Sequence, residues 1–243
     1  MSRLALISDI HSNEVALRAV LADIRRTGVD QTICLGDVAN LGPAPNAVIE
    51  LLAELGCPCI MGNHDEFLLK PELVHAYAQS PNVVASVHWC RSKLSSTELD
   101  FIRGFERDGE FDLGGGSKLY VFHGSPRSNM EDVLATTPPD ILDEMLAGAS
   151  ATVMAGGHTH IQMLRQHHGY LLVNPGSVGL AFKDYVSGLS PTILAHAEYA
   201  IVEEVGGAIE VKLRRLPLDK EKLRRAHLDS DHPLREWQLR QYS

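Results

Sequence analysis

The segment LALISDIH (residues 4–11) joins an uninterrupted apolar run to the polar side chains Asp9 and His11. A short apolar run bounded by polar residues is typical of a strand that is buried on both faces. Residues 13–27 follow with apolar side chains at helical spacing, and Gly28 marks the end of the predicted helix. A buried strand followed by an amphipathic helix predicts a layered α/β fold.

The same alternation continues along the chain. Strands are predicted over residues 31–35, 57–61, 151–155 and 170–173, helices over 45–55 and 138–146, and hairpins over 109–122 and 199–216. Residues 66–110 have a helical pattern and are expected to form an insertion, in which Ser95 and Glu98 form a capping box. The charged tail 219–243 is expected to be a C-terminal helix docked by Trp237. Because no flexible linker separates these parts, we expect residues 1–243 to form a single domain.

The composition narrows the classes of function. Of 243 residues, 22 are Lys or Arg and 31 are Asp or Glu, which gives a formal net charge of −9. A chain this acidic is a poor general binder of extended nucleic acid or of anionic membranes. Four cysteines are too few for a disulfide scaffold, and neither a signal peptide nor a membrane span is recognisable. We therefore expect buried, reduced thiols and a cytoplasmic protein.

Polar residues that can bind metals recur directly after the apolar runs. They are Asp9-x-His11, Gly36-Asp37, Gly62-Asn63-His64-Asp65, His123-Gly124 and Gly156-Gly157-His158-Thr159-His160. Each motif alone is weak evidence, because Asp-x-His pairs and Gly-Asp turns are common on protein surfaces. In open α/β sheets, however, ligands bind beyond the carboxyl ends of the strands, where these five loops converge. If the backbone stays extended, both members of each spaced pair also point the same way. The five together predict a shared metal site.

The order of these motifs resembles that of the calcineurin-like metallophosphoesterase superfamily. The segments GDVANLGP (residues 36–43) and NPGSVG (residues 174–179) resemble its small bacterial phosphodiesterase branch, and the similarity extends from residue 9 to residue 179. The resemblance implies a four-layer αββα fold, in which two mixed β-sheets pack face to face with helices outside.

The resemblance also implies a binuclear metal centre. The first metal would be bound by Asp9, His11, Asp37 and His160, and the second by Asp37, Asn63, His123 and His158, so that Asp37 bridges them. Imidazole, carboxylate and amide ligands without thiolate suit Mn, Fe, Co, Zn or Ni. Two divalent cations bring more positive charge than two carboxylates neutralise, so an acidic protein would gain a local site for an anionic substrate.

The implied reaction is hydrolysis of a phosphoester by direct attack of a hydroxide that bridges the two metals. His64, beside the metal-binding Asn63, resembles the general acid of the superfamily. In its protein phosphatases an Asp supports this histidine and an Arg clamps the phosphate, whereas this chain has Asn40 and Leu41 at those positions. Protein phosphatase activity is therefore disfavoured, and Asp65 or another group would have to support His64.

Small phosphodiesters are the expected substrates, because a diester carries less charge than a monoester and needs the arginine clamp less. Monoesters and dinucleoside polyphosphates are also candidates. Arg127, four residues beyond His123, is either a phosphate ligand or an ordinary surface arginine. The aromatic residues Tyr77, Trp89 and Phe101 of the insertion form either a small core of its own or a lid that stacks on a nucleobase.

Two other functions stay open at this point. The first is a phosphatase of broad specificity that also acts on phosphoproteins. The second is a metal-binding interaction scaffold without catalytic activity. We expect a small phosphorylated substrate as the partner, no extended nucleic acid and no membrane, and a homodimer on base rates alone.

Overall fold

The computed structural model describes residues 2–77, 80–146, 148–185 and 190–243. Its strands are β1 (Arg3–Ile7), β2 (Gln31–Cys34), β3 (Gly109–Gly114), β4 (Ser117–Val121), β5 (Val153–Ala155), β6 (Met163–His167), β7 (Tyr170–Asn174), β8 (His196–Val205) and β9 (Ala208–Pro217). Its helices are α1 (Glu14–Thr27), α2 (Pro45–Leu55), α3 (Asn63–Leu69), the 3₁₀ turn η1 (Pro71–Leu73), α4 (Val74–Tyr77), α5 (Pro81–Lys93), α6 (Ser96–Arg103), α7 (Pro139–Met145), α8 (Lys220–Leu228) and α9 (Arg235–Gln241).

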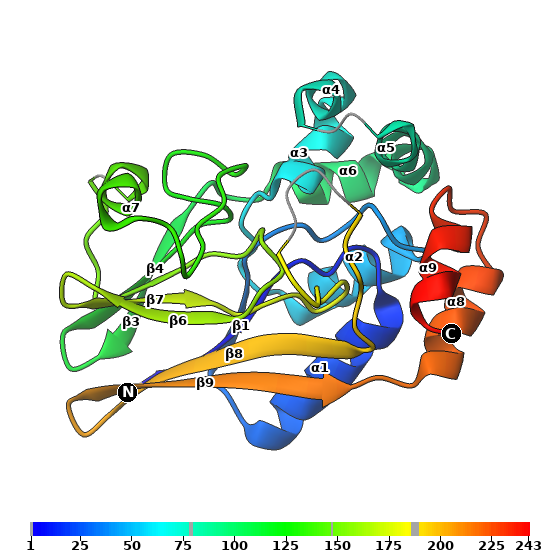
Figure 1. The fold of residues 1–243 in the computed structure, drawn as a ribbon. Helices are drawn as coiled ribbons and strands as arrows, with labels where there is room; N and C mark the ends of the chain where they lie inside the picture. Colours follow the sequence, from blue (N-terminus) through cyan, green and yellow to red (C-terminus); the bar gives the residue numbers. More distant parts are fainter. Residues whose placement is uncertain (1, 78–79, 147, 186–189) are drawn as a thin grey trace.

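The strands form two mixed sheets that lie face to face (Figure 1). One sheet has the order β2-β1-β8-β9, with β1 parallel to β2 and antiparallel to β8. The other has the order β3-β4-β5-β7-β6, with β5 parallel to both of its neighbours. Apolar side chains of α1 and α2 cover the outer face of the first sheet, and those of α7 cover the outer face of the second. The four-layer αββα arrangement predicted above is therefore confirmed.

Strand β1 shows why its apolar run is uninterrupted. Leu4 and Leu6 face the second sheet, in a cluster that includes Val121, whereas Ala5 and Ile7 face the helices on the outer side. Successive side chains of a strand point to opposite faces, so a strand covered on both faces needs apolar residues at every position. Burying a leucine side chain contributes roughly 1.5–3 kcal/mol.

Local signals fix the bounds of the helices that cover the first sheet. The Asn13 side chain accepts a hydrogen bond from the Ala16 N–H (3.1 Å) and caps α1, which ends at Gly28. Helix α2 has Pro45 at its first position and ends at Gly56 in the left-handed conformation. Both bounds of α2 agree with the sequence prediction.

Three predicted elements differ in the structure. Residues 57–61 form no named strand, only isolated bridges from Cys59 to Cys34 and from Ile60 to Glu106. The helical segment expected from residue 66 begins at Asn63, and the C-terminal tail contains two helices, α8 and α9, in place of one. The capping box at the start of α6 and both predicted hairpins are confirmed.

All four cysteines have free thiols, and Cys57 is half-buried whereas Cys34, Cys59 and Cys90 are buried as expected. In the part of the chain that the structure describes, no helix has both the length and the apolar character that a membrane span requires.

Candidate metal centre

The candidate ligands lie on loops at one end of the strands, and backbone hydrogen bonds join these loops to one another. The Asp9 N–H donates to the Gly36 carbonyl (3.0 Å), which continues the pairing of β1 with β2 beyond the strands. The Gly157 N–H donates to the His123 carbonyl (2.8 Å) and joins the loops after β5 and β4. The convergence expected from the strand–loop pattern is therefore present.

Asp9, His11 and His160 form a first buried cluster, in which the ligand atoms lie within 4.8 Å of one another. The Nε2 atoms of His11 and His160 are 3.1 Å apart, and His160 Nε2 is 3.4 Å from Asp9 Oδ1. All three side chains thus direct a donor atom to one point, as ligands of a single cation do.

Asp37, His123 and His158 form a second buried cluster of the same kind. His123 Nε2 is 3.4 Å from Asp37 Oδ2 and 3.1 Å from the side-chain oxygen of Asn63. The same Asp37 oxygen is 3.7 Å from His11 Nε2, an atom of the first cluster. Asp37 therefore lies between the two clusters, with one oxygen facing a histidine of each.

The backbone that carries the ligands is not extended, contrary to the expectation for the spaced pairs. Asp9 and His11 have φ values of 54° and 48°, and His158 and His160 have values of 69° and 58°. These residues occupy the left-handed region, which non-glycine residues rarely adopt and which is typical of functional sites. The side chains of each pair converge because the loop turns tightly there.

Glycines permit the close approach of these loops. A Cβ atom at Gly62 would lie 2.4 Å from the Asp37 backbone nitrogen, and one at Gly36 would lie 2.6 Å from the Gly62 nitrogen. No rearrangement of a side-chain end relieves a clash with backbone, so both positions require glycine.

Charge is concentrated in the centre although water is excluded from it. Burial raises the pKa of Asp9, but the charge and hydrogen bond of His160 and the charge of His123 together outweigh burial and lower that pKa to about 2. Burial lowers the pKa of His123, but the charge and hydrogen bond of Asp37 and the charge of Asp9 together outweigh burial and raise it to about 9. The neighbouring histidines, His123 first among them, likewise outweigh burial and hold the pKa of Asp37 well below its ordinary value. Both carboxylates are therefore ionised at neutral pH and need positive charge beside them.

The donor set fits divalent metal ions. His123 Nδ1 donates to the Leu35 carbonyl and His160 Nδ1 donates to the Leu180 carbonyl, both at 2.7 Å. Each ring therefore directs Nε2 into the centre, where this atom would offer a lone pair once a cation took the place of its proton. Backbone carbonyls orient metal-binding histidines in this way. The Asp9 Oδ1 atom is buried without a hydrogen-bond partner among the described residues, as an oxygen reserved for a cation would be.

A family model described as the calcineurin-like phosphoesterase superfamily domain matches residues 2–193. The chain belongs to this superfamily. Over 179 residues it is 31% identical to an uncharacterized protein from Methanocaldococcus jannaschii, an alignment that covers 74% of this chain and 71% of that protein.

Two solved structures share the fold over almost the full length. A metallophosphoesterase from Sphaerobacter thermophilus has a TM-score of 0.75 at 23% identity, covering 99% of this chain and 98% of the other. A hypothetical protein from Pyrococcus horikoshii OT3 has a TM-score of 0.81 at 19% identity, covering 99% and 97%. The buried His/Asp clusters are what a binuclear metal site of this superfamily requires.

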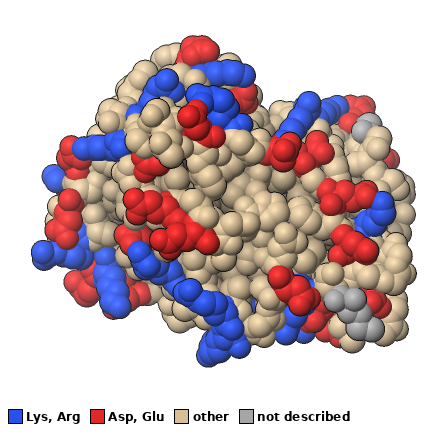
Figure 2. All heavy atoms as spheres, turned by 180° about the vertical axis from the view of Figure 1, so that it is seen from behind, with Lys and Arg blue, Asp and Glu red and all other residues tan. Residues whose placement is uncertain are grey.

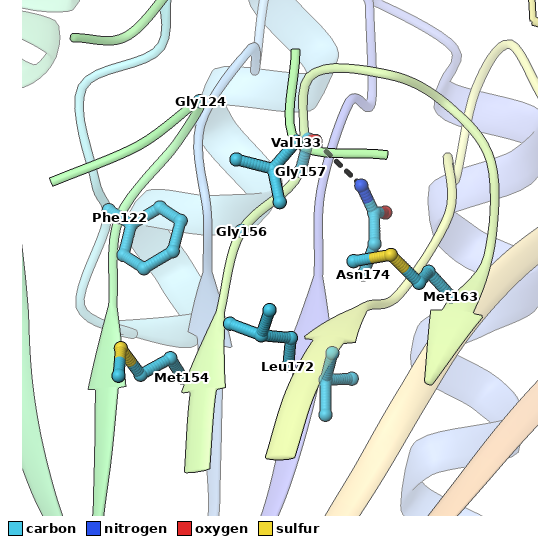
Figure 3. Close-up of a pocket in the computed structure, with 10 residues that line it drawn as sticks. Phe122, Gly124, Val133, Met154, Gly156, Gly157, Met163, Leu172 and Asn174 are labelled. Carbon is cyan, nitrogen blue, oxygen red and sulfur yellow. Dashed lines mark hydrogen bonds between the residues drawn. The ribbon is translucent and has the colours of Figure 1, made fainter. Parts of the chain in front are cut away.

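Two residues of the NPGSVG segment (residues 174–179) form hydrogen bonds to loops that contain candidate ligands. Asn174 Nδ2 donates to the Gly157 carbonyl (2.7 Å), the bond drawn in Figure 3 beside a small, mostly apolar cavity behind the His158 loop. Ser177 Oγ donates to the Asp9 carbonyl (2.7 Å). Asn174 and Ser177 therefore fix the positions of the ligand loops and are not themselves candidate ligands.

Asp65 does not support His64, and its carboxylate instead organises the loop that contains Asp37. It accepts hydrogen bonds from the N–H groups of Asp37 (2.7 Å) and Val38 (2.9 Å). The His64 ring is instead within hydrogen-bond distance of the Asn40 side chain, whose Nδ2 is 2.8 Å from His64 Nδ1. The residue that replaces the phosphatase Asp is therefore also the partner of this histidine.

Arg127 is paired with an acidic neighbour. Its guanidinium forms an ion pair with Glu131 (2.7 Å) and donates to the Glu144 carbonyl (3.2 Å). No contact found among the described residues joins it to either cluster, and its role in binding phosphate stays a prediction.

Two aromatic residues border the centre. The ring of Phe182 stacks on His160 with centroids 4.2 Å apart, and the edge of Tyr77 approaches His64 at 5.6 Å. Trp89 instead packs on His232, and Phe101 packs on Phe105. Of the three aromatic residues that the sequence singled out in the insertion, Tyr77 is in ring contact with the centre, and Phe67 also approaches His64, with ring centroids 5.3 Å apart. The length of the loop over residues 180–195 predicts that Phe182 flanks the site or forms a subunit contact, and residues 186–189 of this loop lie outside the described residues.

Proposed function

We propose that this chain is a binuclear metal-dependent phosphoesterase that hydrolyses small phosphodiesters. The observation that carries the proposal is the position of Asp37, whose Oδ2 atom is 3.7 Å from His11 Nε2 and 3.4 Å from His123 Nε2. One carboxylate that faces both histidine clusters is the arrangement needed to hold two cations side by side.

The ligand residues would hold the metals in two sets that share Asp37. Asp9, His11 and His160 would hold one ion, and Asn63, His123 and His158 the other. When bound, two divalent ions activate water and neutralise charge at the phosphate. Mn, Fe, Co, Zn and Ni all suit this donor set. The buried loops fix the ligands in advance, so little reorganisation accompanies the reaction.

His64 would act on the oxygen that leaves phosphorus. Its backbone N–H donates to Asp37 Oδ1 (2.8 Å), which places it directly beside the ligands. Its ring lies edge-on to His11 with centroids 5.1 Å apart. A hydrogen-bond donor at this position stabilises the negative charge on that oxygen as the ester bond breaks.

The charges around the centre favour a diester over a monoester. Asp132 Oδ1 is 3.5 Å from His158 Nε2, and its side chain is 42% exposed at the rim. A monoester carries a charge of about −1.5 to −2 at neutral pH, so this carboxylate repels it more than a singly charged diester. This chain has Asn40 and Leu41 in place of the Asp and Arg of protein phosphatases, which also favours a diester over a monoester.

Extended nucleic acid is not the proposed substrate. On the face shown in Figure 2, basic and acidic side chains are interspersed, and the net charge is −9. Nucleic acid binding depends on clustered basic residues that neutralise successive phosphates. A small phosphorylated molecule suits this surface better.

The test compares bis(p-nitrophenyl) phosphate with p-nitrophenyl phosphate as substrates of protein loaded with Mn, Co, Ni or Zn. We expect faster hydrolysis of the diester, and a loss of more than about a hundredfold in Asp37→Asn because the shared ligand loses its charge. The matched control is Asp100→Asn, since Asp100 is an exposed carboxylate on α6. Its activity should equal that of the wild type.

Each alternative predicts a different result. Faster turnover of the monoester and of phosphopeptides would favour a broad phosphatase. Binding of two metals without turnover of either ester would favour an interaction scaffold. Equal activity of Asp37→Asn and Asp100→Asn would contradict the proposed centre.

A further inference from the structure

A chain of buried polar side chains leads from the C-terminal segment to His64. His232 Nε2 is 2.9 Å from Ser86 Oγ, which donates to Asn40 Oδ1 (2.6 Å). Asn40 Nδ2 is 2.8 Å from His64 Nδ1. Asn40 and Ser86 are fully buried and His232 is 2% exposed, so these bonds do not compete with bulk water.

Backbone N–H groups fix the direction of every bond in this chain. The Leu234 N–H can only donate, and it is 3.2 Å from His232 Nδ1. The proton of the neutral His232 ring therefore lies on Nε2, which donates to Ser86. Burial lowers the pKa of His232 to about 3, in keeping with a neutral ring.

A second backbone group fixes the Asn40 amide. The Leu41 N–H donates to Asn40 Oδ1 (2.8 Å), the oxygen that also accepts from Ser86. Two donors on the same atom identify it as the oxygen, so the amide nitrogen faces His64. His64 Nδ1 must therefore accept, and the proton of its neutral ring lies on Nε2.

His232, at the far end of this series of hydrogen bonds, is distant from His64 in the sequence. His232 lies between α8 and α9, and Ser86 lies on α5 of the insertion. The Trp89 ring meets His232 edge-on at 4.7 Å, and Gln238 of α9 donates to the Leu41 carbonyl (2.7 Å). The C-terminal segment, which contains α8 and α9 (orange and red in Figure 1), thus contacts both α5 and the Asn40 loop.

We propose that His232, Ser86 and Asn40 are positioning residues that hold His64 in the tautomer protonated on Nε2, from which it can donate a hydrogen bond to the leaving oxygen. The catalytic consequence rests on the proposed function, whereas the tautomer does not. The C-terminal helices would then belong to the active site through hydrogen bonds, without touching a substrate.

The first experiment measures the tautomer by two-bond ¹H–¹⁵N correlation spectra of the zinc-loaded protein. The His64 signals are those missing from His64→Gln. We expect an unprotonated Nδ1 in the wild type. In Asn40→Asp, a nearly isosteric change, the carboxylate can only accept, so the proton should move to Nδ1. A wild-type ring protonated on Nδ1 would overturn the proposal, whether or not the protein has activity.

The second experiment compares Ser86→Ala with Ser92→Ala, a control on the same helix whose exposed hydroxyl donates to the Trp89 carbonyl. Ser86→Ala should lower kcat about tenfold for a diester with a phenolate leaving group, and less for p-nitrophenolate, whose negative charge needs less stabilisation by a hydrogen bond. KM and metal content should stay unchanged, and His232→Gln, which keeps an N–H donor, should retain more activity than His232→Ala. Equal losses with both leaving groups would indicate a merely structural role and contradict the proposal.

Discussion

Asp37 occupies the most constrained position of the candidate centre. Its Oδ1 atom accepts the His64 N–H (2.8 Å), its Oδ2 atom faces both clusters, and its own N–H donates to Asp65 (2.7 Å). Its φ value of 55° places it in the left-handed region. Every polar group of this residue therefore has an assigned partner, which explains why a loop of such unfavourable backbone conformation is retained.

His227 gives a prediction about pH at the scale of a single residue. Its ring stacks on Tyr242 (5.8 Å), its Nδ1 atom is buried without a described partner, and burial lowers its pKa to about 4. The unfolded chain, with a histidine pKa near 6.5, binds the proton more tightly than the folded protein does. The free energy of unfolding should therefore fall as the pH decreases from 6.5 towards 4.

His227→Phe should keep the ring stacked on Tyr242 and remove the group that binds the proton. We expect the variant to be about 1 kcal/mol more stable than the wild type near about pH 5, with a smaller gain near about pH 7. Urea denaturation at the two pH values measures both differences. His232, with a pKa of about 3, titrates in the same direction, so some pH dependence should persist. A variant with the full pH dependence of the wild type would show that His227 is not its source.

Single residues were predictable from the sequence where the signal is local. The candidate ligands could be found because each follows an apolar run directly, as Asp9 follows β1. The partners of His64 could not, since Ser86 contacts His232 across 146 positions and neither carries a motif. The left-handed backbone at the ligands was also not predicted, because Asp and His far more often adopt other backbone conformations.

At the scale of an element, α6 begins with the capping box that the sequence predicts. Glu98 N–H donates to Ser95 Oγ (3.3 Å), and the Glu98 carboxylate accepts from the Ser95 N–H (2.7 Å). Ser95→Ala should lower the free energy of unfolding by about 1 kcal/mol, because one N–H at the helix start loses its acceptor. Thermal unfolding measures the change.

Ser92→Ala again serves as the control, because Ser92 lies on α5 and its hydroxyl donates to the Trp89 carbonyl, so it accepts no N–H of α6. An equal effect of the two substitutions would contradict the capping role.

The segment 57–61 shows why one element was predicted wrongly. Its apolar residues fit a strand, but Pro58 has no N–H to donate and only its carbonyl accepts, from the Cys34 N–H (2.9 Å). The next bond goes from the Ile60 N–H to the Cys34 carbonyl (2.8 Å), so the pairing is confined to one residue of β2. Helix α2, whose stop signals are local, was predicted with its observed bounds.

At the scale of the whole molecule, the position of the candidate ligands explains how an acidic chain can contain a phosphate-binding site. Its net charge is −9, yet the candidate ligands are 0–8% exposed and lie at one end of two packed sheets. The strand–helix pattern predicts an α/β fold but contains no information on how two sheets stack, and the four layers followed only from the family resemblance. The metal centre is likewise an assembly of loops from residue 9 to residue 160.

Anomalous diffraction from crystals of the zinc-loaded protein tests the central claim most directly. We expect two neighbouring peaks, one contacted by Asp9, His11 and His160 and the other by His123 and His158, with Asp37 contacting both. A third group of metal-competent residues, Asp143, His167 and His168, lies outside the centre and forms ion pairs of 2.6 and 3.1 Å. A single peak in the centre, or zinc bound only at that third group, would contradict the binuclear site.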